Sequence, residues 1–231
     1  MPAKVRPPER VHRRVRRTIF RKGNNKLFGD EAYERIKDAI LTMQLSPGQP
    51  LTEGELGARL GLGRMPVREA LLRLAQEGMV TIVPRKGSFV TRVGIEDLQK
   101  IFELRLTVEG LSARLAAERI TALEFDTLEA LFEKSPNIQE GSEQHVRIDR
   151  AFHLTVARAT KNEYLERAVE HTLNLAMRLL YLSGSRMSKV SEIMPEYQAV
   201  LDALRGRDPD AACRAMQAHI EEFRKKVRGM I

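Results

Sequence analysis

The chain is poor in sulfur chemistry and lacks a long apolar segment. It has 231 residues and one cysteine, Cys213, so an internal disulfide is excluded, and we expect this thiol to be a small packing residue. No run of about 18 apolar residues occurs, and no signal-peptide pattern opens the chain. These absences exclude a membrane span and the usual secretory route, and they predict a cytoplasmic protein.

Acidic residues are scarce at the N-terminus. Residues 1–29 contain ten Lys or Arg and one Glu, so of the net charge of +8 about +9 lies in this segment and −1 in the rest. A basic segment with few apolar residues cannot fold alone, and we expect a flexible arm over residues 1–29 that contacts DNA phosphates or enters a minor groove. A solvated tail without a role and an organelle-targeting segment are the alternatives.

Residues 60–80, LGLGRMPVREALLRLAQEGMV, combine an apolar face with a cationic one. The apolar residues follow the i, i+3, i+4, i+7 spacing of a helix: Val67, Ala70, Leu71 and Leu74. Arg64, Arg68 and Arg73 stand away from that face. Pro66 suits the first turn and Gly78 the C-terminal end, which predicts a helix from Pro66 to Glu77 with its polar face free to read DNA.

The flanking segments complete a DNA-binding fold. Residues 33–43 have the apolar periodicity of one helix, and Thr52 with Glu55 forms a capping box that opens a second, short one. After the reading helix, the segments around Val80–Ile82 and Phe89–Val90 predict two strands. The turn between them, Pro84 to Gly87, places Arg85 and Lys86 beside a glycine that can approach a phosphate. Residues 30–93 are therefore predicted to form a winged helix-turn-helix.

Residues 94–231 are predicted to be helical throughout. A 3-4-3-4 apolar stripe opens this region, formed by Ile101, Leu104, Val108, Leu111 and Leu115. Thr121 with Glu124 caps the next helix, and Asp208 with Pro209 opens the last. Further helices are predicted over residues 142–159, 164–182, 189–204 and 209–228. Short loops between long helices predict an all-α antiparallel bundle, so the chain as a whole is mainly α.

Three places in the predicted bundle carry chemistry. Asp149 and His153 are four residues apart on one helical face, His219 lies on the apolar stripe of the last helix, and Tyr197 lies on another apolar stripe. A carboxylate and two imidazoles that meet inside a bundle suit Zn, Ni or Mn. A buried histidine bonded to an aspartate, with no metal, is the alternative interpretation.

The residues from Ala32 through PGQPLTE, LGLGRMPVREAL and RKGSFV resemble the N-terminal domain of the GntR family of bacterial regulators. The resemblance implies that Arg64 and Arg68 contact operator bases, and arginine does pair with two acceptors of guanine. Gly87 corresponds to the family's wing glycine. Two positions depart from the pattern: Gly54 replaces a common arginine, and Met65 replaces a small hydroxyl residue. The operator sequence therefore cannot be copied from relatives.

The segments FELRLTVEG, DRAFH and LDALRGRDPDAACRAMQAH, with Asn162, resemble the FCD ligand-binding domain of the FadR-like branch. The resemblance implies metal ligands at Asp149, His153 and His219, with Tyr197 where a fourth, histidine ligand is usual. It also implies that Arg105 points into the effector cavity to pair with a carboxylate; an i,i+4 ion pair with Glu109 on the helix surface is the alternative. The residues predicted to bind the effector are Arg105, Asp149, His153, Tyr197 and His219.

The sequence thus predicts a homodimeric transcription regulator, a repressor, that binds a palindromic operator in double-stranded DNA. Its affinity for DNA is expected to be controlled by a small organic acid, with an acyl-CoA as the alternative effector. The predicted DNA contacts are Arg64, Met65, Arg68, Arg85, Lys86 and Gly87. A metal-dependent enzyme with an accessory nucleic-acid domain is the rival interpretation, but no Gly-rich phosphate loop and no His-Glu-x-x-His pattern supports it.

Overall fold

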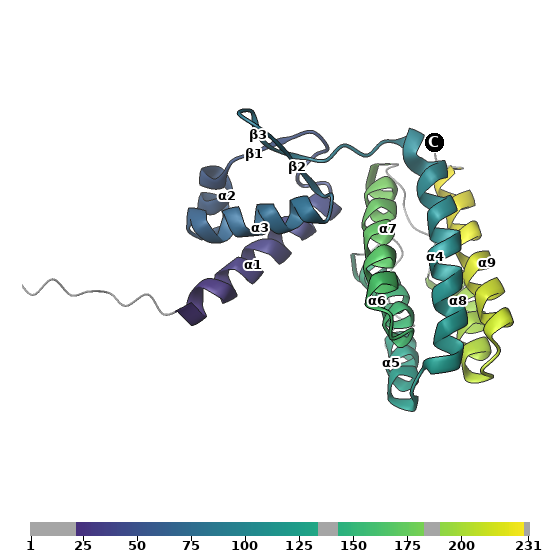
Figure 1. Cartoon of the computed structure of the whole chain (residues 1–231). Coiled ribbons are helices and arrows are strands. Elements are labelled where there is room, and N and C mark those ends of the chain that lie inside the picture. The colour runs from purple at the N-terminus through teal and green to yellow at the C-terminus, as the bar shows by residue number, and fades with distance from the viewer. Residues whose placement is uncertain (1–21, 134–142, 183–189, 229–231) are drawn as a thin grey trace, which may run out of the picture.

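The computed structural model describes residues 22–133, 143–182 and 190–228 of the chain. Figure 1 shows a small N-terminal head of helices and short strands beside a bundle of long helices. The head has its own apolar core, built around Ile36, Ile40, Val67 and Leu74, and the bundle has a second one around Phe102, Phe152 and Met216. The predicted fold class, a winged helix-turn-helix followed by an all-α bundle, is confirmed.

The head is built from elements whose ends are set by local chemistry. They are α1 (Lys22–Leu41), β1 (Pro50–Leu51), α2 (Glu53–Leu60), α3 (Arg64–Gln76), β2 (Val80–Val83) and β3 (Gly87–Val90). The Thr52 side chain accepts a hydrogen bond from the backbone N–H of Glu55 and so caps α2. Gly78, with a φ of +74°, takes the left-handed conformation that ends α3. The predicted reading helix is therefore confirmed, with its start two residues earlier.

The wing has three strands where the sequence predicted two. The strand order is β1-β3-β2, and both pairs are antiparallel, with Pro50 opposite Phe89 and Thr81 opposite Phe89 from the other side. The missed strand, β1, is two residues long and contains a proline, which is tolerated at a sheet edge but gives no alternating pattern. This strand ties the segment before α2 to the wing.

Residues 22–29 of the predicted arm form the first two turns of α1, which begins at Lys22. A helix that is already anchored adds one hydrogen bond for each residue it takes in. The anchor is the buried face of α1, where Tyr33, Ile36 and Ile40 are at most 6% exposed. Residues 1–21 of the predicted arm lie outside the described part of the chain.

The bundle follows a short 3-10 turn, η1 (Ile95–Asp97). Its helices are α4 (Leu98–Arg119), α5 (Ala122–Glu133), α6 (Glu143–Ala159), α7 (Glu163–Leu182), α8 (Val190–Arg205) and α9 (Pro209–Arg228). The predicted caps are present: the Glu124 amide donates to the Thr121 hydroxyl, and the Ala211 amide donates to the Asp208 carboxylate. None of the described helices combines the length and the apolar character needed to cross a membrane.

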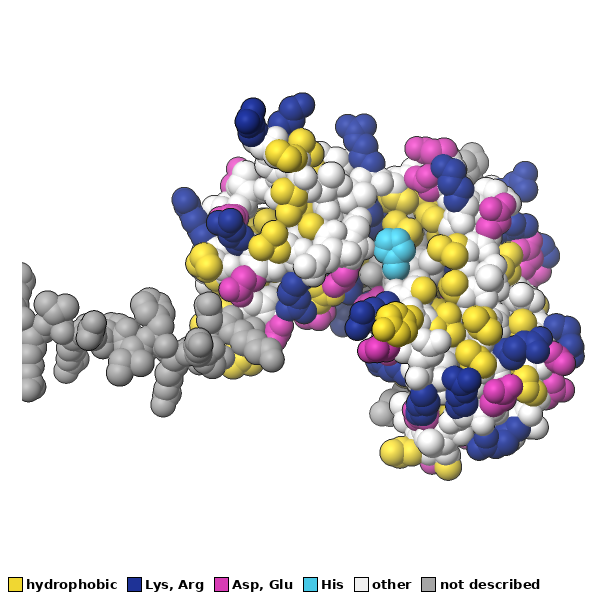
Figure 2. Space-filling model, viewed as in Figure 1, with side chains coloured by type: hydrophobic (Ala, Val, Ile, Leu, Met, Phe, Trp, Pro, Cys, Tyr) yellow, Lys and Arg dark blue, Asp and Glu magenta, His cyan; other side chains and the backbone are white. Residues whose placement is uncertain are grey.

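The apolar stripe predicted on α4 does not all face the core. Ile101 is buried, but Leu104 and Leu111 are 47% and 45% exposed. The face that α4 buries instead includes polar residues, among them Arg105 and Glu109. Apolar spacing marks a face that avoids water and does not say what covers it, so the spacing alone predicted the helix and not the surroundings of this stripe. Figure 2 shows hydrophobic side chains on the bundle face formed by α4 and α7.

Candidate DNA-binding surface and metal site

The start of α3 presents cationic side chains to solvent. Arg64, Met65 and Arg68 are exposed, and the opposite face of the helix is buried. Gly63 is the N-cap, and the first turn contains no acidic residue, so the positive end of the helix dipole adds to the charge of Arg64. This end of α3 is therefore a suitable surface for DNA.

The tip of the wing is a second cationic point on the head. Arg85 and Lys86 are exposed in the turn between β2 and β3, and Arg85 has a φ of +64°. Gly87 has a φ of +106°, where a side chain would be strained although no atom of the described residues lies within 4 Å of an added Cβ. Figure 2 shows the Lys and Arg side chains of the wing tip and of the start of α3 on the sides of the head that face away from the bundle.

The neighbours of the three arginines on α3 determine which of these side chains are free to contact DNA. A Cβ on Gly54 would lie 3.7 Å from an Arg64 guanidinium nitrogen, so glycine leaves the space beside Arg64 open. The Arg68 Nε lies 4.0 Å from a Glu53 carboxylate oxygen, a loose pair with an arginine side chain that is 64% exposed. Arg73, at the other end of α3, stacks 3.9 Å from the Tyr33 ring centre and pairs with Asp30 at 2.6 Å. Arg73 is therefore held against α1.

Inside the bundle, three of the predicted residues meet at one point. The Nε2 atoms of His153 on α6 and His219 on α9 are 3.2 Å apart. The Asp149 Oδ1 lies 3.4 Å from the His153 Nε2 and 3.7 Å from the His219 Nε2. Both imidazoles are at most 5% exposed. Chain positions up to 70 residues apart thus converge, as the sequence predicted.

The three atoms have the spacing that a divalent cation requires. Metal–ligand bonds of about 2.1 Å at tetrahedral angles place neighbouring ligand atoms about 3.4 Å apart. A carboxylate oxygen with two imidazole nitrogens is also a donor set that Zn and its neighbours accept. Among the described residues, Asp149, His153 and His219 are the group of three that could hold an ion. The residues present therefore fit a metal.

Two glutamates that the sequence did not predict orient the imidazoles. The His153 Nδ1 pairs with the Glu109 carboxylate, and the His219 Nδ1 lies 3.0 Å from the Glu196 Oε2. A carboxylate on the far nitrogen fixes the ring and makes the near nitrogen a better metal ligand. The sequence signals for these two residues were weak, since Glu109 enters the sequence prediction only as a surface partner of Arg105 and Glu196 does not enter it.

The ionisation of the cluster follows from these contacts. Burial alone would raise the pKa of Asp149, but the charge of His153 and hydrogen bonds with both imidazoles hold it well below its usual range. Burial would lower the pKa of His153, but Glu109 and Asp149 outweigh it and raise the value to about 9. Asp149 is thus ionised and His153 is protonated in the metal-free cluster, so a cation would have to displace that proton.

Tyr197 is a hydrogen-bond donor to the cluster. Its hydroxyl donates to the Asp149 Oδ1 at 2.6 Å, and the side chain is 1% exposed. Burial, and then the Asp149 charge, raise the pKa of Tyr197 well above its usual value. The phenol therefore stays protonated and orients the aspartate.

Arg105 lies inside the bundle and is paired there. Its Nε donates to the Glu109 Oε1 at 2.6 Å, and both side chains are at most 3% exposed. The ion pair considered as the alternative is thus formed, but in the interior and not on the helix surface. The guanidinium also lies 5.5 and 5.6 Å from the ring centres of Phe102 and Phe223. Because the same Glu109 carboxylate pairs with both Arg105 and His153, Arg105 is connected to the cluster through Glu109.

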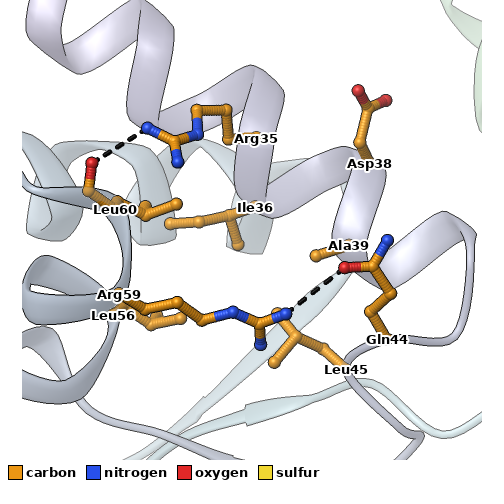
Figure 3. Close-up of a pocket in the computed structure, with 9 residues that line it drawn as sticks. All are labelled: Arg35, Ile36, Asp38, Ala39, Gln44, Leu45, Leu56, Arg59 and Leu60. Atoms are coloured by element: carbon orange, nitrogen blue, oxygen red, sulfur yellow. Dashed lines mark hydrogen bonds between the residues drawn. The ribbon is translucent and has the colours of Figure 1, made fainter.

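A separate pocket lies in the head between α1 and α2 and measures about 280 Å³. Figure 3 shows that its two arginines are held by neighbours: Arg35 donates to the Leu60 carbonyl at 2.9 Å, and Arg59 to the Gln44 side chain at 3.3 Å. The pocket contains none of the predicted effector residues. It is not a candidate for the effector site predicted from the sequence.

Two known family models match the chain, one over the head and the other over the bundle. Residues 28–90 match the model of the bacterial regulatory proteins of the gntR family, and residues 100–222 match the FCD domain. The transcriptional repressor RspR of Escherichia coli K12 is 28% identical over 86% of this chain and 88% of its own length. A probable repressor of a D-xylose utilization operon from Paenarthrobacter nicotinovorans is 28% identical over 78% of the chain and 80% of its own length.

A similar fold has been solved. The structure of E. coli McbR/YncC matches 87% of this chain and 97% of its own chain with a TM-score of 0.73 at 22% identity. The family model for residues 28–90 and the two sequence relatives named above are of transcription regulators, which excludes the rival interpretation of the chain as an enzyme.

Proposed function

Because the chain belongs to the GntR family of bacterial transcription regulators and carries an FCD domain, we propose that it is a metabolite-controlled repressor with a metal-dependent effector site. The observation that carries this proposal is the cluster of Asp149, His153 and His219, whose ligand atoms lie within 4.8 Å of one another. A divalent cation held there leaves coordination positions for a small organic acid, whose carboxylate would complete the shell. The protein would act in the cytoplasm, where bacterial DNA lies.

The head supports the DNA-binding half of the proposal. Arg64 and Arg68 would read bases in the major groove, with Met65 between them, and Arg85, Lys86 and Gly87 would contact the adjacent backbone. One α3 helix reads too few base pairs for useful specificity, whereas two helices related by a two-fold axis read a palindrome. We therefore assign a homodimer to the active form.

Sequences selected from random DNA by the purified protein would supply the operator needed to test the proposal. Small organic acids would then be screened for release of the protein from this DNA, with and without added Zn²⁺, Ni²⁺ or Mn²⁺. We expect at least one acid to act only when metal is present. If elemental analysis and calorimetry find that the parent protein binds none of these ions, the metal-dependent part of the proposal is wrong.

The exposed apolar face of α4 is the surface that we assign to the dimer. Changing Leu104 and Leu111 together to Glu should convert the protein to a monomer, because four buried carboxylates would face one another across the two-fold axis. Analytical ultracentrifugation measures the mass directly. Leu123→Glu is the matched control, since Leu123 is also an exposed leucine, at 76%, but lies on α5. An unchanged dimer in the double variant would place the interface elsewhere.

Tyr197 offers a test of the ligand set. Tyr197→Phe removes the hydrogen bond to Asp149 and should weaken metal binding by about 10- to 100-fold, as loss of an outer-shell partner does. Tyr197→His introduces a fourth nitrogen ligand and should strengthen it. Calorimetric titration with Zn²⁺ gives both affinities. The opposite order of affinities would mean that the side chain at this position does not face the metal.

A further inference from the structure

A buried lysine joins the head to the bundle. Lys37 on α1 is 4% exposed, and its ammonium nitrogen donates to three acceptors: the Tyr33 hydroxyl at 2.7 Å, the Glu77 Oε2 at 3.2 Å and the Glu170 Oε1 at 2.9 Å. An ammonium has three N–H groups, so this buried charge is fully satisfied. Its partners come from α1, from the C-terminal end of α3 and from α7. Lys37 thus links α1, the end of α3 and α7 through hydrogen bonds.

Glu170, which accepts a hydrogen bond from Lys37, also accepts one from a residue of α6. The Arg150 guanidinium donates to the Glu170 Oε1 at 2.7 Å, so one carboxylate oxygen accepts hydrogen bonds from both Lys37 and Arg150. Arg150 directly follows Asp149, which belongs to the metal cluster. Another buried nitrogen of Arg150, Nη1, has no hydrogen-bond partner among the described residues. A change at Asp149 that rotates or shifts α6 therefore moves the group that holds Glu170.

Glu77 connects this network to the reading helix. It is the C-cap residue of α3, and its second carboxylate oxygen accepts a hydrogen bond from Tyr33 at 2.7 Å. Its backbone carbonyl lies 3.1 Å from the His171 Nδ1 on α7. Beside these contacts, a groove of about 660 Å³ separates the end of α3 from α7. The end of α3 thus touches the bundle at a few polar points with space next to them.

We propose that Arg150, Glu170, Lys37 and Glu77 transmit the state of the Asp149, His153 and His219 cluster to the end of the reading helix. The proposal rests on the proposed function in so far as the cluster is an effector site. Transmission requires an element with two arrangements that both sites influence. In this proposal the element is the Glu170 oxygen, which in the structure accepts from both Arg150 and Lys37. Its second arrangement would lack the bond to Arg150, which would change the hydrogen bonding of Lys37 and, through Lys37, of Glu77.

Hydrogen exchange of the full-length protein tests the transmission without knowledge of operator or effector. The readout is the exchange rate of backbone amides in residues 74–80, measured by mass spectrometry. The cluster is perturbed in two ways, by saturation with Zn²⁺ and by Asp149→Asn. In the parent, we expect Asp149→Asn, and Zn²⁺ if it binds, to change the exchange rate of residues 74–80. In the Glu170→Gln background, we expect the same perturbations to leave that rate unchanged. Glu170→Gln leaves Lys37 its bonds to Tyr33 and Glu77, so the head keeps its core.

Glu166→Gln is the matched control. Glu166 lies one turn before Glu170 on α7 and pairs with Arg158 of α6 at 2.9 Å, so it joins the same two bundle helices through a different ion pair. The control should retain the full response. Lys37→Met should lose it as Glu170→Gln does.

Failure of the two proposals can be told apart. If calorimetry shows no Zn²⁺ binding to the parent, the metal part of the proposed function is wrong, and Asp149→Asn still tests the transmission. An unchanged response in Glu170→Gln overturns the transmission proposal, as does the absence of any response to Asp149→Asn in the parent. A response that survives Glu170→Gln and disappears in His171→Ala also overturns it, because the path would then run through the Glu77 carbonyl.

Discussion

Arg68→Ala is expected to weaken binding to the selected operator at least about tenfold and to relax the preference for one base in each half-site. Each arginine that pairs with a base contributes about 1 to 3 kcal/mol of discrimination, and a homodimer loses the contact twice. Arg64→Ala should act in the same way at a different base position. The effect is expected to be large because the Arg68 side chain is 64% exposed and its ion pair with Glu53 is loose, which leaves the guanidinium available to DNA.

Competition binding against operator variants mutated at single positions measures the relaxed preference. Arg167→Ala is the charge-matched control, since that side chain is 74% exposed and lies on α7. It should change operator and random DNA affinity equally and only slightly. Equal losses for operator and random DNA in Arg68→Ala would show that Arg68 contacts phosphates and not bases.

His219→Ala is expected to abolish metal binding and the thermal stabilisation that metal provides. An ion present at 100 times its dissociation constant adds about 2.7 kcal/mol to the stability of the state that binds it. For a protein of this size that corresponds to a rise in Tm of roughly 5–10 °C in the parent. The variant should show none of this rise, because only Asp149 and His153 of the cluster remain.

Differential scanning fluorimetry with and without Zn²⁺ measures the stabilisation, and elemental analysis measures the bound ion. His171→Ala removes an exposed histidine that contacts the Glu77 carbonyl, and it should keep the full response to Zn²⁺. His219→Gln separates loss of the ligand from loss of core volume, since glutamine fills more of the space. If the parent and His219→Ala respond equally to Zn²⁺, the ion binds elsewhere.

The elements of the fold could be predicted because their ends are marked by single residues. Three helices begin at a side chain that accepts a hydrogen bond from a backbone N–H of the first turn: Thr52, Thr121 and Asp208. A fourth, α3, ends at Gly78 with its left-handed backbone. All four residues lie at the helix ends that the sequence predicted. The β1 strand could not be predicted, because its two residues are ordered by pairing with β3 and not by any preference of their own. The surroundings of the α4 stripe could not be predicted for a related reason: apolar spacing does not distinguish a core residue from an exposed one such as Leu104 or Leu111.

The candidate site was predictable to the extent that its residues lie on one helical turn or match a family pattern. Asp149 and His153 are four residues apart, and His219 follows from the resemblance. Glu109, Glu196 and Lys37 were missed, because each acquires its role from partners on other helices. Lys37 did leave a trace, since a lysine follows Ile36 on a helix face that is otherwise apolar. An unexplained charge on an apolar face is a sign of a tertiary partner.

The turn after α3 limits how freely heads and bundles of this kind can be exchanged. Gly78 has a left-handed backbone, and a Cβ added to it would lie 3.3 Å from the His171 ring of α7. The head therefore fits α7 through a position where both the backbone and the space favour glycine. A chimaera that joins this head to another regulator's bundle must reproduce the shape of α7 opposite Gly78 as well as the carboxylate opposite Lys37. Domain modularity in this architecture is thus restricted by a contact surface, even though the connecting segment itself is short.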